Sequence, residues 1–492
     1  MTDRLATSRF FLKIGEVGIP ILTWLLITLP LWLSPFHPAV VAYFIICFDL
    51  YFLYKSVGTA YYATISYLQI LSYGKIPYHK KLLQKTKSRD IYHFIVIPNY
   101  KEPLHKLEST IEAIIQSDYP FKNLVLVLAF EMREAEAKEK DEQLRLKYRD
   151  HFKDIISSYH VLKTNEVPGK ASNQTNAVRM VEQYAVERSL EFKHVLITIC
   201  DADSIFSKNY FSYLTYEFLK DRDRSYHFYW APVLLYNNFW RLPFFVRMQA
   251  TLSSLLRLAF LSQKEKLIHI STYSTNLWLL KQVGYWDVDV IPEDWHIYYQ
   301  AFFTFGDKVK TLPLYTIING DAVYSGNIIK TLKNRYEQEK RWAWGASDIG
   351  YTWGKLFNTP HIPFLSKLKK MAFLAETHLL WPTSFFILTL SALIPPLVNP
   401  VFKRTVLGFL LPQLSGFILT TASLMLILYI YLDIQLRKKV AVKTNPVSIP
   451  FLIIQWYLLP LVSFVLSSLP ALEAHTRLLL GKKITYKVTE KV

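Results

Sequence analysis

The stretch HVLITICDADS, residues 194 to 204, decides the fold. It begins as an apolar run of the kind that forms a fully buried strand, and it ends in two carboxylates, Asp201 and Asp203. Asp is a common turn former, so these two residues alone would fit a solvated turn. Two acids at the end of a buried strand also fit a ligand site at the edge of a sheet. The surrounding sequence distinguishes these interpretations.

Strand-like and helix-like segments alternate ahead of this stretch. The strand candidates are YHFIVIP (92–98), LVLVLAF (124–130) and YHVL (159–162). The helical candidates lie at 104–117, at about 131–151 and at 171–189. Such alternation predicts an α/β fold with a mostly parallel sheet covered on both faces. Ligands bind such sheets at the carboxyl ends of the strands, which is where DAD falls, so a ligand site is favoured over a turn.

Long apolar runs flank this middle region, and 51% of the chain is hydrophobic. We expect an N-terminal membrane region (1–75), a middle domain (88–355) and a C-terminal membrane region with a tail (356–492). The predicted spans are 18–34, 39–54, 379–398, 406–432 and 447–469. The first run is longer than the apolar part of a signal peptide and has no small-residue cleavage site, so it is predicted to be a membrane helix.

Basic residues indicate the orientation. Lys and Arg cluster at 75–89 and at 437–443, and such clusters mark the cytoplasmic side of a membrane protein. Lys403 and Arg404 lie on the predicted outer side, against this trend. We therefore expect a multi-pass membrane protein with a cytoplasmic middle domain. The two cysteines, Cys47 and Cys200, offer no disulfide framework, as expected in a reducing compartment.

The net charge of +18 raises a second class of function, the binding of nucleic acid or anionic lipid. The basic residues concentrate beside the predicted spans, where attraction to anionic lipid headgroups explains them. No nucleic-acid-binding motif is present in the sequence. Membrane lipids are therefore expected partners, and nucleic acid is not.

Further polar residues follow the other predicted strands. Glu102 stands in IPNYKEP after the first strand, and Glu131 and Glu134 stand in AFEMRE after the second. The last two also fit a solvated helix of mixed charge. Lys170, in VPGKASNQTN, stands at a strand-to-helix junction that suits an anionic or hydroxylated ligand. The alternative for Lys170 is an ordinary helix start with a solvated lysine.

Two motifs follow later in the chain. VIPEDWHIYY contains the acid pair Glu293 and Asp294. YEQEKRWAWG contains Gln338, Arg341 and Trp342, whose spacings of three and four place them on one helix face. An amphipathic helix at the membrane surface is the alternative interpretation of this second motif.

Taken in order, DAD, PED and QEKRW resemble the aspartates and the QxxRW motif of the membrane-embedded family 2 glycosyltransferases, the group of cellulose, hyaluronan and poly-N-acetylglucosamine synthases. GKASN and STYSTNLWLLKQVGYWD are supporting matches. The resemblance covers residues from about 90 to 353 and the flanking membrane parts. It implies a GT-A-like, Rossmann-like cytoplasmic domain between transmembrane helices. It also implies an inverting hexosyltransferase that uses a nucleotide sugar donor.

The resemblance also implies roles for individual residues. Asp203 would hold Mg²⁺ or Mn²⁺, and Asp201 would contact the metal or the ribose. Asp294 would be the general base beside Glu293. Lys170 and Arg341 would stabilise phosphate charge, and Gln338 and Trp342 would contact the acceptor. Glu102 is assigned to the donor site, and Glu131 replaces the aspartate that usually contacts the nucleotide base. PED departs from the more common TED but keeps the essential carboxylate.

The C-terminal stretch YKVTEKV, residues 486 to 492, resembles the FxVTxK gating loop of cellulose synthases, with Tyr486 in place of Phe. Thr489 and Lys491 could then reach a pyrophosphate, whereas a basic tail at the membrane surface is the alternative. Three full spans after a cytoplasmic domain would leave this tail outside the cell. We therefore expect a re-entrant segment between about 447 and 480, broken by its three prolines, that returns the tail to the cytoplasm.

Three functions remain open at this point. A processive synthase would extend a polysaccharide and pass it through its own spans. A non-processive enzyme would place one sugar on a lipid carrier or glycolipid. A non-catalytic membrane scaffold is the third possibility, and the presence of Asp203, Asp294 and Arg341 argues against it.

Overall fold

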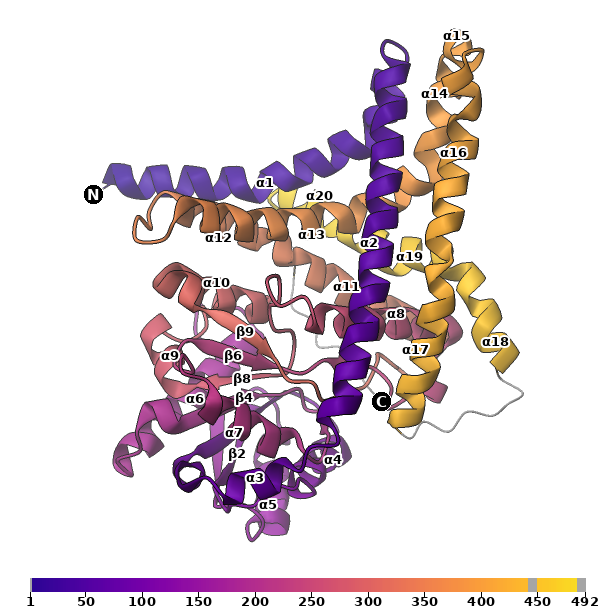
Figure 1. The fold of residues 1–492 in the computed structure, drawn as a ribbon. Helices are drawn as coiled ribbons and strands as arrows, with labels where there is room; N and C mark the ends of the chain where they lie inside the picture. Colours follow the sequence, from indigo (N-terminus) through magenta and orange to yellow (C-terminus); the bar gives the residue numbers. More distant parts are fainter. Residues whose placement is uncertain (1, 441–448, 485–492) are drawn as a thin grey trace.

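A computed structural model of the chain describes residues 2–440 and 449–484. Figure 1 shows an α/β domain below a group of long helices. The core of the α/β domain is a seven-stranded sheet in the order β3-β2-β1-β4-β8-β6-β9. A three-stranded sheet, β5-β10-β7, lies beside it. The strands are β1 (Tyr92–Asn99), β2 (Leu124–Glu131), β3 (Asp154–His160), β4 (Val195–Ile199), β5 (Ile205–Phe206), β6 (His227–Trp230), β7 (Val233–Leu234), β8 (Tyr273–Asn276), β9 (Lys310–Pro313) and β10 (Ile318–Asn319).

The direction of the strands places the site. Strands β3, β2, β1 and β4 are mutually parallel, whereas β8 is antiparallel to both β4 and β6. Every residue of β2 is buried, as expected for a central parallel strand covered on both faces. The carboxyl ends of the parallel strands therefore meet at one edge, close to Asp201.

The predicted α/β class is confirmed, and three of the four predicted strands match β1, β2 and β4. The third prediction is wrong: YHVL (159–162) overlaps only the end of β3, which begins at Asp154. This strand pairs with β2 alone, at the edge of the sheet. An edge strand is partly exposed, so Ser157 and Ser158 interrupt the apolar run on which the prediction depended.

Besides α8 (Phe244–Leu261), nine α-helices belong to the α/β domain between residues 78 and 356, all of which the structure describes. They are α3 (Tyr78–Leu83), α4 (Leu104–Ile115), α5 (Ala137–Tyr148), α6 (Lys170–Glu187), α7 (Tyr210–Lys220), α9 (Leu277–Val283), α10 (Glu293–Phe305), α11 (Ile328–Ala343) and α12 (Ser347–Leu356). The two that begin at Lys170 and Glu293 carry predicted site residues in their first turns, and α11 carries three more near its end.

The remaining helices are mostly long and apolar. They are α1 (Thr2–Leu33), α2 (Pro38–Tyr73), α8 (Phe244–Leu261), α13 (Phe364–Leu390), α14 (Ile394–Val398), α15 (Pro400–Lys403), α16 (Val406–Ser423), α17 (Met425–Lys439), α18 (Ile449–Ile454), α19 (Leu459–Ser463) and α20 (Leu469–Leu479). Six helical segments among the described residues are long and apolar enough to cross a membrane. Five of them overlap the predicted spans. The sixth, α8, was not predicted, and 61% of its apolar window is buried inside the protein.

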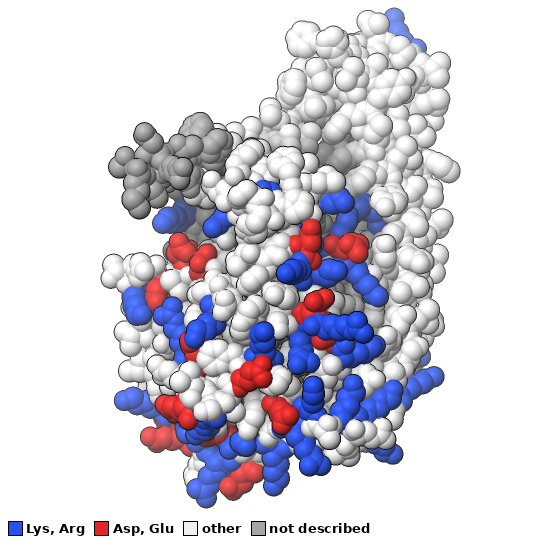
Figure 2. Space-filling model, turned by 60° about the vertical axis from the view of Figure 1, so that its left-hand side comes forward, with Lys and Arg blue, Asp and Glu red and all other residues white. Residues whose placement is uncertain are grey.

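The helices differ in direction. Figure 1 shows α2 and α16 upright and side by side, with α15 at the top. The first part of α1 and the helices α12 and α13 run roughly across this direction, above the sheet and to the left of the upright helices. On the face in Figure 2, charged side chains cover the lower part of the molecule, and the upper part is almost free of them until the basic residues at its tip. This distribution fits a membrane around the upper helices.

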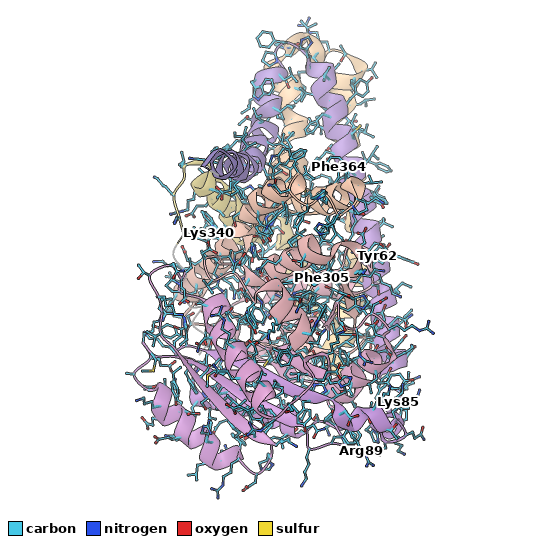
Figure 3. All side chains as sticks on the ribbon, turned by 90° about the vertical axis from the view of Figure 1, so that its left-hand side faces the viewer. Tyr62, Lys85, Arg89, Phe305, Lys340 and Phe364 are labelled. Atoms are coloured by element: carbon cyan, nitrogen blue, oxygen red, sulfur yellow. The ribbon has the colours of Figure 1, made fainter. Side chains whose placement is uncertain are left out.

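The basic residues after α2 are not beside the membrane helices. Helix α2 has 36 residues and is therefore about 54 Å long, well beyond the roughly 30 Å of a hydrocarbon core. It carries the following chain to the lower part of the α/β domain, where Figure 3 labels Lys85 and Arg89. The Nζ of Lys85 lies 4.8 Å from the ring centre of Tyr216. The prediction that these residues lie beside the spans is therefore wrong, because α2 extends far past the apolar run.

The last span is irregular, in the region where a broken segment was predicted. Short helical pieces follow one another from α18 through 3₁₀, α and π turns to α20, with Pro460 and Pro470 each at the start of a new piece. The gating-loop prediction for 486–492, including Thr489 and Lys491, lies outside the described residues.

Candidate active site

A cavity of about 1730 Å³ opens at the carboxyl edge of the sheet and continues between the long helices. Every predicted site residue in the described part of the chain lines it. These residues are Glu102, Glu131, Lys170, Asp201, Asp203, Glu293, Asp294, Gln338, Arg341 and Trp342. The topology therefore brings together residues that are up to 240 positions apart in the sequence.

Asp201 and Lys170 form the centre of the site. Asp201 follows the end of β4, and Lys170 is the first residue of α6, whose N-cap is Gly169. The Nζ of Lys170 donates to Oδ1 of Asp201 at 2.8 Å and lies 3.7 Å from Oε1 of Glu293. Its side chain is only 13% exposed, so the interpretation of a solvated lysine at a helix start is wrong. Burial alone would lower the pKa of Lys170, but attraction to Asp201 and Glu293 outweighs it and raises the pKa.

Asp203 is more buried than Asp201 and has different partners. Its Oδ2 accepts the backbone N–H of Asp321 at 2.8 Å. Asp321 follows β10 and forms an ion pair with Lys106 of α4. The side chain of Asn237 donates to the backbone oxygen of Asp203 at 3.2 Å. Segments that follow β10 and β7 of the small sheet thus hold the second aspartate of DAD, and no local sequence pattern indicates this support.

Glu293 and Asp294 form the first turn of α10. The two oxygens of Asp294 accept the backbone N–H of Ser271 at 2.8 Å and that of Trp295 at 3.0 Å. Burial raises the pKa of Asp294, although these two hydrogen bonds and Lys170 oppose the rise. Burial also raises the pKa of Glu293 to about 7, against the attraction of Lys170. A carboxylate with a raised pKa is a better proton acceptor near neutral pH.

Ser271 connects these groups and was not identified from the sequence. Its hydroxyl donates to Oδ2 of Asp201, its N–H donates to Asp294, and its carbonyl accepts from Lys170 at 3.1 Å. Its φ of 68° lies in the left-handed region, which a non-glycine residue occupies only at a cost. Ser271 is the first residue of STYSTNLWLLKQVGYWD, but this stretch is only a supporting match, and no periodicity distinguishes the serine from the polar residues beside it.

The end of β2 supplies a second acidic position. Oε1 of Glu131 lies 3.1 Å from Nδ1 of His160, and its Oε2 lies 3.2 Å from Nε of Arg133. Glu131 is therefore a buried residue at a strand end and not part of a solvated helix; the helix begins only at Ala137. Glu102, which follows β1, lines the same cavity.

Helix α11 carries Gln338, Arg341 and Trp342. Arg335, one turn earlier, donates to Gln338 and forms an ion pair with Glu339. Glu339 also accepts from Gln249 of α8 at 3.2 Å. The interpretation of α11 as a surface helix is therefore wrong, because its polar face is bonded to α8 and lines the cavity.

A divalent cation fits the carboxylates after β4. Among the described residues, no group of three or more His, Cys, Asp or Glu side chains is arranged to enclose a metal. Mg²⁺ is commonly bound by one or two carboxylates together with substrate phosphates and water, and Asp201 and Asp203 provide such a pair beside the cavity. The donor set is therefore suited to a cation that arrives with a phosphorylated ligand.

Comparisons with known proteins agree with this chemistry. Residues 196–432 match a family model described as "Glycosyl transferase family group 2". This range includes Asp201, Asp294 and Arg341. No curated protein matches the chain. This match identifies the class: the chain is a glycosyltransferase. Over the matched residues it is similar to family 2 of that class.

Solved structures were also compared. A mannosyltransferase from Pyrobaculum calidifontis, in complex with GDP-Man and Mn²⁺, is 13% identical, with 89% of this chain and 100% of that chain covered and a TM-score of 0.44. TarS 1-349 of S. aureus is 10% identical, with 71% and 92% covered and a TM-score of 0.35. GalNAc-T7 with UDP, GalNAc and Mn²⁺ is 13% identical, with 59% of each chain covered and a TM-score of 0.34.

Proposed function

We propose that this protein is an inverting, metal-dependent hexosyltransferase that uses a nucleotide sugar at the cytoplasmic face of a membrane and extends a polysaccharide processively. One observation carries the proposal. The cavity that holds Asp201 and Asp294 continues between the membrane helices, where its lining includes α2 from Phe48 to Tyr62. Of this lining, Phe48 to Tyr54 falls within the predicted span 39–54 and corresponds to about 9 Å along the helix, so the cavity reaches from the catalytic domain into the membrane part.

The donor would bind at the carboxyl edge of the sheet. Asp203 and Asp201 would hold Mg²⁺ or Mn²⁺, and such a cation neutralises the negative charge that develops on a departing nucleoside diphosphate. Lys170 and Arg341 would add positive charge beside the phosphates. Glu131 and Glu102, which line the cavity at the ends of β2 and β1, would contact the nucleoside. In the structure Lys170 bonds to Asp201, so this lysine would exchange part of that contact for the donor.

Asp294 would take the proton from the acceptor hydroxyl. Its backbone bonds to Ser271 and Trp295 fix its orientation, and its raised pKa suits a general base. Glu293 lies beside Asp294, and the negative charges of the two carboxylates interact. Attack by the acceptor oxygen on the anomeric carbon, opposite the leaving diphosphate, would invert the configuration in one displacement. Gln338 and Trp342 would hold the acceptor sugar on the cavity side of α11.

The membrane part of the cavity suits a carbohydrate chain. Aromatic side chains line it along several helices, and aromatic surfaces with a few polar groups are typical of ligand sites. The aromatic lining residues include Tyr51, Tyr62, Phe373, Trp381, Phe385 and Trp456. A growing polymer that starts beside Asp294 would enter this space directly. The basic segment 437–443 and the distribution of charge in Figure 2 support a cytoplasmic catalytic domain.

A second function is favoured by one specific observation. Three residues of the cavity lining, Tyr54, Ile427 and Tyr457, are 72%, 69% and 84% exposed. The cavity therefore also opens sideways, toward the surface that the membrane would cover. A lipid-linked acceptor could enter there, receive one sugar and leave.

Product length distinguishes the two functions. The purified full chain in nanodiscs would be supplied with Mn²⁺, a labelled donor and a large excess of acceptor over enzyme. A processive synthase gives long products while most acceptor is still unmodified. A single-transfer enzyme converts the acceptor to a product that is one sugar longer and no further.

A further inference from the structure

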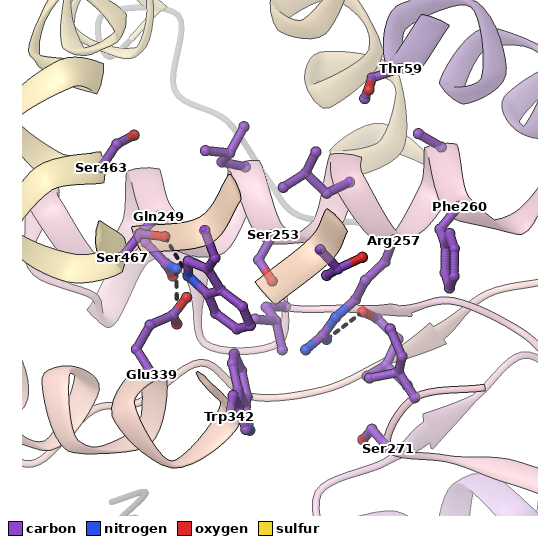
Figure 4. A pocket seen from close by; sticks show the side chains of 18 of the residues that line it. Thr59, Gln249, Ser253, Arg257, Phe260, Ser271, Glu339, Trp342, Ser463 and Ser467 are labelled. Atoms are coloured by element: carbon purple, nitrogen blue, oxygen red, sulfur yellow. Dashed lines mark hydrogen bonds between the residues drawn. The ribbon is translucent and has the colours of Figure 1, made fainter. Parts of the chain in front are cut away.

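Helix α8 carries a polar stripe on the face that lines the cavity. Gln249, Ser253 and Arg257 are spaced by four residues and therefore lie on one face of the helix. All three line the cavity, and Figure 4 shows them along α8, with Trp342 of α11 below. Leu252 and Leu256, which precede Ser253 and Arg257, also line the cavity, so the stripe is a narrow polar track in an apolar wall.

The two ends of the stripe differ. Gln249 is part of the internal structure, because it donates to Glu339, which pairs with Arg335. Arg257, at the other end, makes a different kind of contact. Its Nη1 donates to the backbone oxygen of Val233 at 2.9 Å, and its guanidinium lies 5.6 Å from the ring centre of Trp342.

Arg257 lacks the counter-ion that comparable arginines have. Its exposure is 8%, and in the described residues no carboxylate lies within ion-pair distance of its guanidinium; Asp201, Glu339 and Asp294 attract it only from farther away, and Arg335 repels it. Arg335 and Arg437, each 2% exposed, pair with Glu339 and Asp433 respectively. A buried charge is costly unless it is paired, and a carbonyl dipole compensates it only in part. The missing negative charge is therefore expected to come from a ligand in the cavity.

The position of Arg257 favours the acceptor over the donor as the source of this charge. It lies against Trp342, which belongs to the predicted acceptor side of the cavity, and it is close enough to Asp294, the proposed base, and to Asp201 for both to attract it. From Arg257 the stripe runs along α8 toward Ser463 and Ser467 in the membrane part, as Figure 4 shows. The predicted donor phosphates already have Lys170 and Arg341.

We propose that Arg257 binds an anionic group, a phosphate or a carboxylate, of the acceptor, and that the enzyme therefore selects acidic acceptors. A guanidinium presents two parallel donors that match either oxyanion. The inference rests on the proposed function for the identity of the ligand as an acceptor. It goes beyond that function by naming the chemical class that the site prefers.

Binding to the full chain in a neutral detergent tests this proposal. The donor site is first saturated with nucleoside diphosphate and Mg²⁺. Two matched pairs of probes are then titrated: farnesyl phosphate against farnesol, and methyl glucuronide against methyl glucoside. We expect one acidic probe to bind at least tenfold more tightly than its neutral partner, and the pair that shows the preference distinguishes a lipid phosphate from a sugar carboxylate.

Variants make the test specific. Arg257→Gln should abolish the preference for the acidic probe and leave nucleotide binding unchanged. Arg257→Lys should keep part of the preference. Arg145→Gln is the control, at an arginine of α5 that is paired with Asp141, and it should have no effect. Equal affinity for charged and neutral probes in the unaltered protein would overturn the proposal. So would weaker nucleotide binding in Arg257→Gln, which would place the residue at the donor. A protein that transfers no sugar refutes the proposed function, but the binding result can still be interpreted.

Discussion

The backbone N–H of Ser271 donates to Oδ2 of Asp294 at 2.8 Å. The hydroxyl of the same serine donates to Asp201. Ser271, two positions before β8, thus links the aspartate after β4 to the aspartate at the start of α10. The predicted donor-binding and proton-accepting groups are therefore held in a fixed relation by a side chain that has no acid-base role of its own.

Two substitutions of Ser271 distinguish the effect of its hydroxyl from the effect of its backbone conformation. Ser271→Ala and Ser271→Gly both remove the bond to Asp201, so each should lower the transfer rate roughly tenfold or more, since a hydrogen bond to a charged group contributes about 1.5–3 kcal/mol. Glycine tolerates a φ of 68°, whereas alanine does not. Thermal unfolding should therefore show Ser271→Gly to be more stable than Ser271→Ala by about 1 kcal/mol. Equal activity of both variants and the unaltered protein would contradict the role of the hydroxyl.

Asp203→Asn tests the proposed cation site. Loss of the carboxylate should abolish transfer and weaken the Mn²⁺-dependent part of nucleotide binding, measured by calorimetry with and without the metal. Asp150→Asn, at an aspartate that is 89% exposed, is the matched control and should behave like the unaltered protein. Full activity of the unaltered protein in EDTA would show that no cation is needed.

The pH dependence of transfer tests the proton acceptor. Asp294 must be ionised to act as a base, and burial raises its pKa. The rate should therefore fall as the pH decreases, and the midpoint should lie above the usual range of an aspartate. Because Glu293, with a pKa of about 7, shares the site, the two carboxyls titrate as a pair. A rate that stays constant down to roughly pH 4 would exclude Asp294 as the base.

His296 should make stability depend on pH in the alkaline range. Its ring nitrogens lie 2.7 Å from Asp348 and 2.8 Å from Asp287. Burial alone would lower the pKa of His296, but these carboxylates raise it from 6.5 to about 10. The contribution of the charged ring is fully present below about pH 6.5 and is lost as the pH rises through about 10.

His296→Gln should therefore lower the unfolding temperature at pH 7 and reduce its decline between pH 7 and 10. One pKa unit corresponds to about 1.4 kcal/mol, so the loss should amount to several kcal/mol at most. His361→Gln, at an exposed histidine, is the control. An unchanged decline in His296→Gln would assign the pH dependence to other groups.

Much of the fold was predictable because its strongest signals are local. The apolar runs of β1, β2 and β4 are long and unbroken, and in a parallel sheet their ends must meet at one edge. That geometry is sufficient to bring Glu102, Glu131 and Asp201 together. The edge strand β3 and the helix α8 were missed for opposite reasons. The first contains serines in a half-exposed strand, and the second is an apolar helix that packs inside the protein.

The parts of the site that were not predicted depend on contacts between distant segments. Ser271, Asp321 and Glu339 act through partners that lie from 23 to more than 100 positions away. Arg257 carried a local signal that could have been used, since Gln249, Ser253 and Arg257 recur at helical spacing in an apolar run. Such a stripe indicates a helix that faces a polar cavity.

The most direct test of sugar transfer in this cavity is a single assay with the purified full chain. The unaltered protein and Asp294→Asn would be incubated with Mn²⁺, an acceptor-containing membrane extract and a panel of radiolabelled nucleotide sugars. We expect the unaltered protein to incorporate label from one donor, Asp294→Asn to lose this incorporation, and both proteins to bind that donor with similar affinity. Incorporation at a similar rate by both proteins, or by neither from any donor, would contradict this expectation.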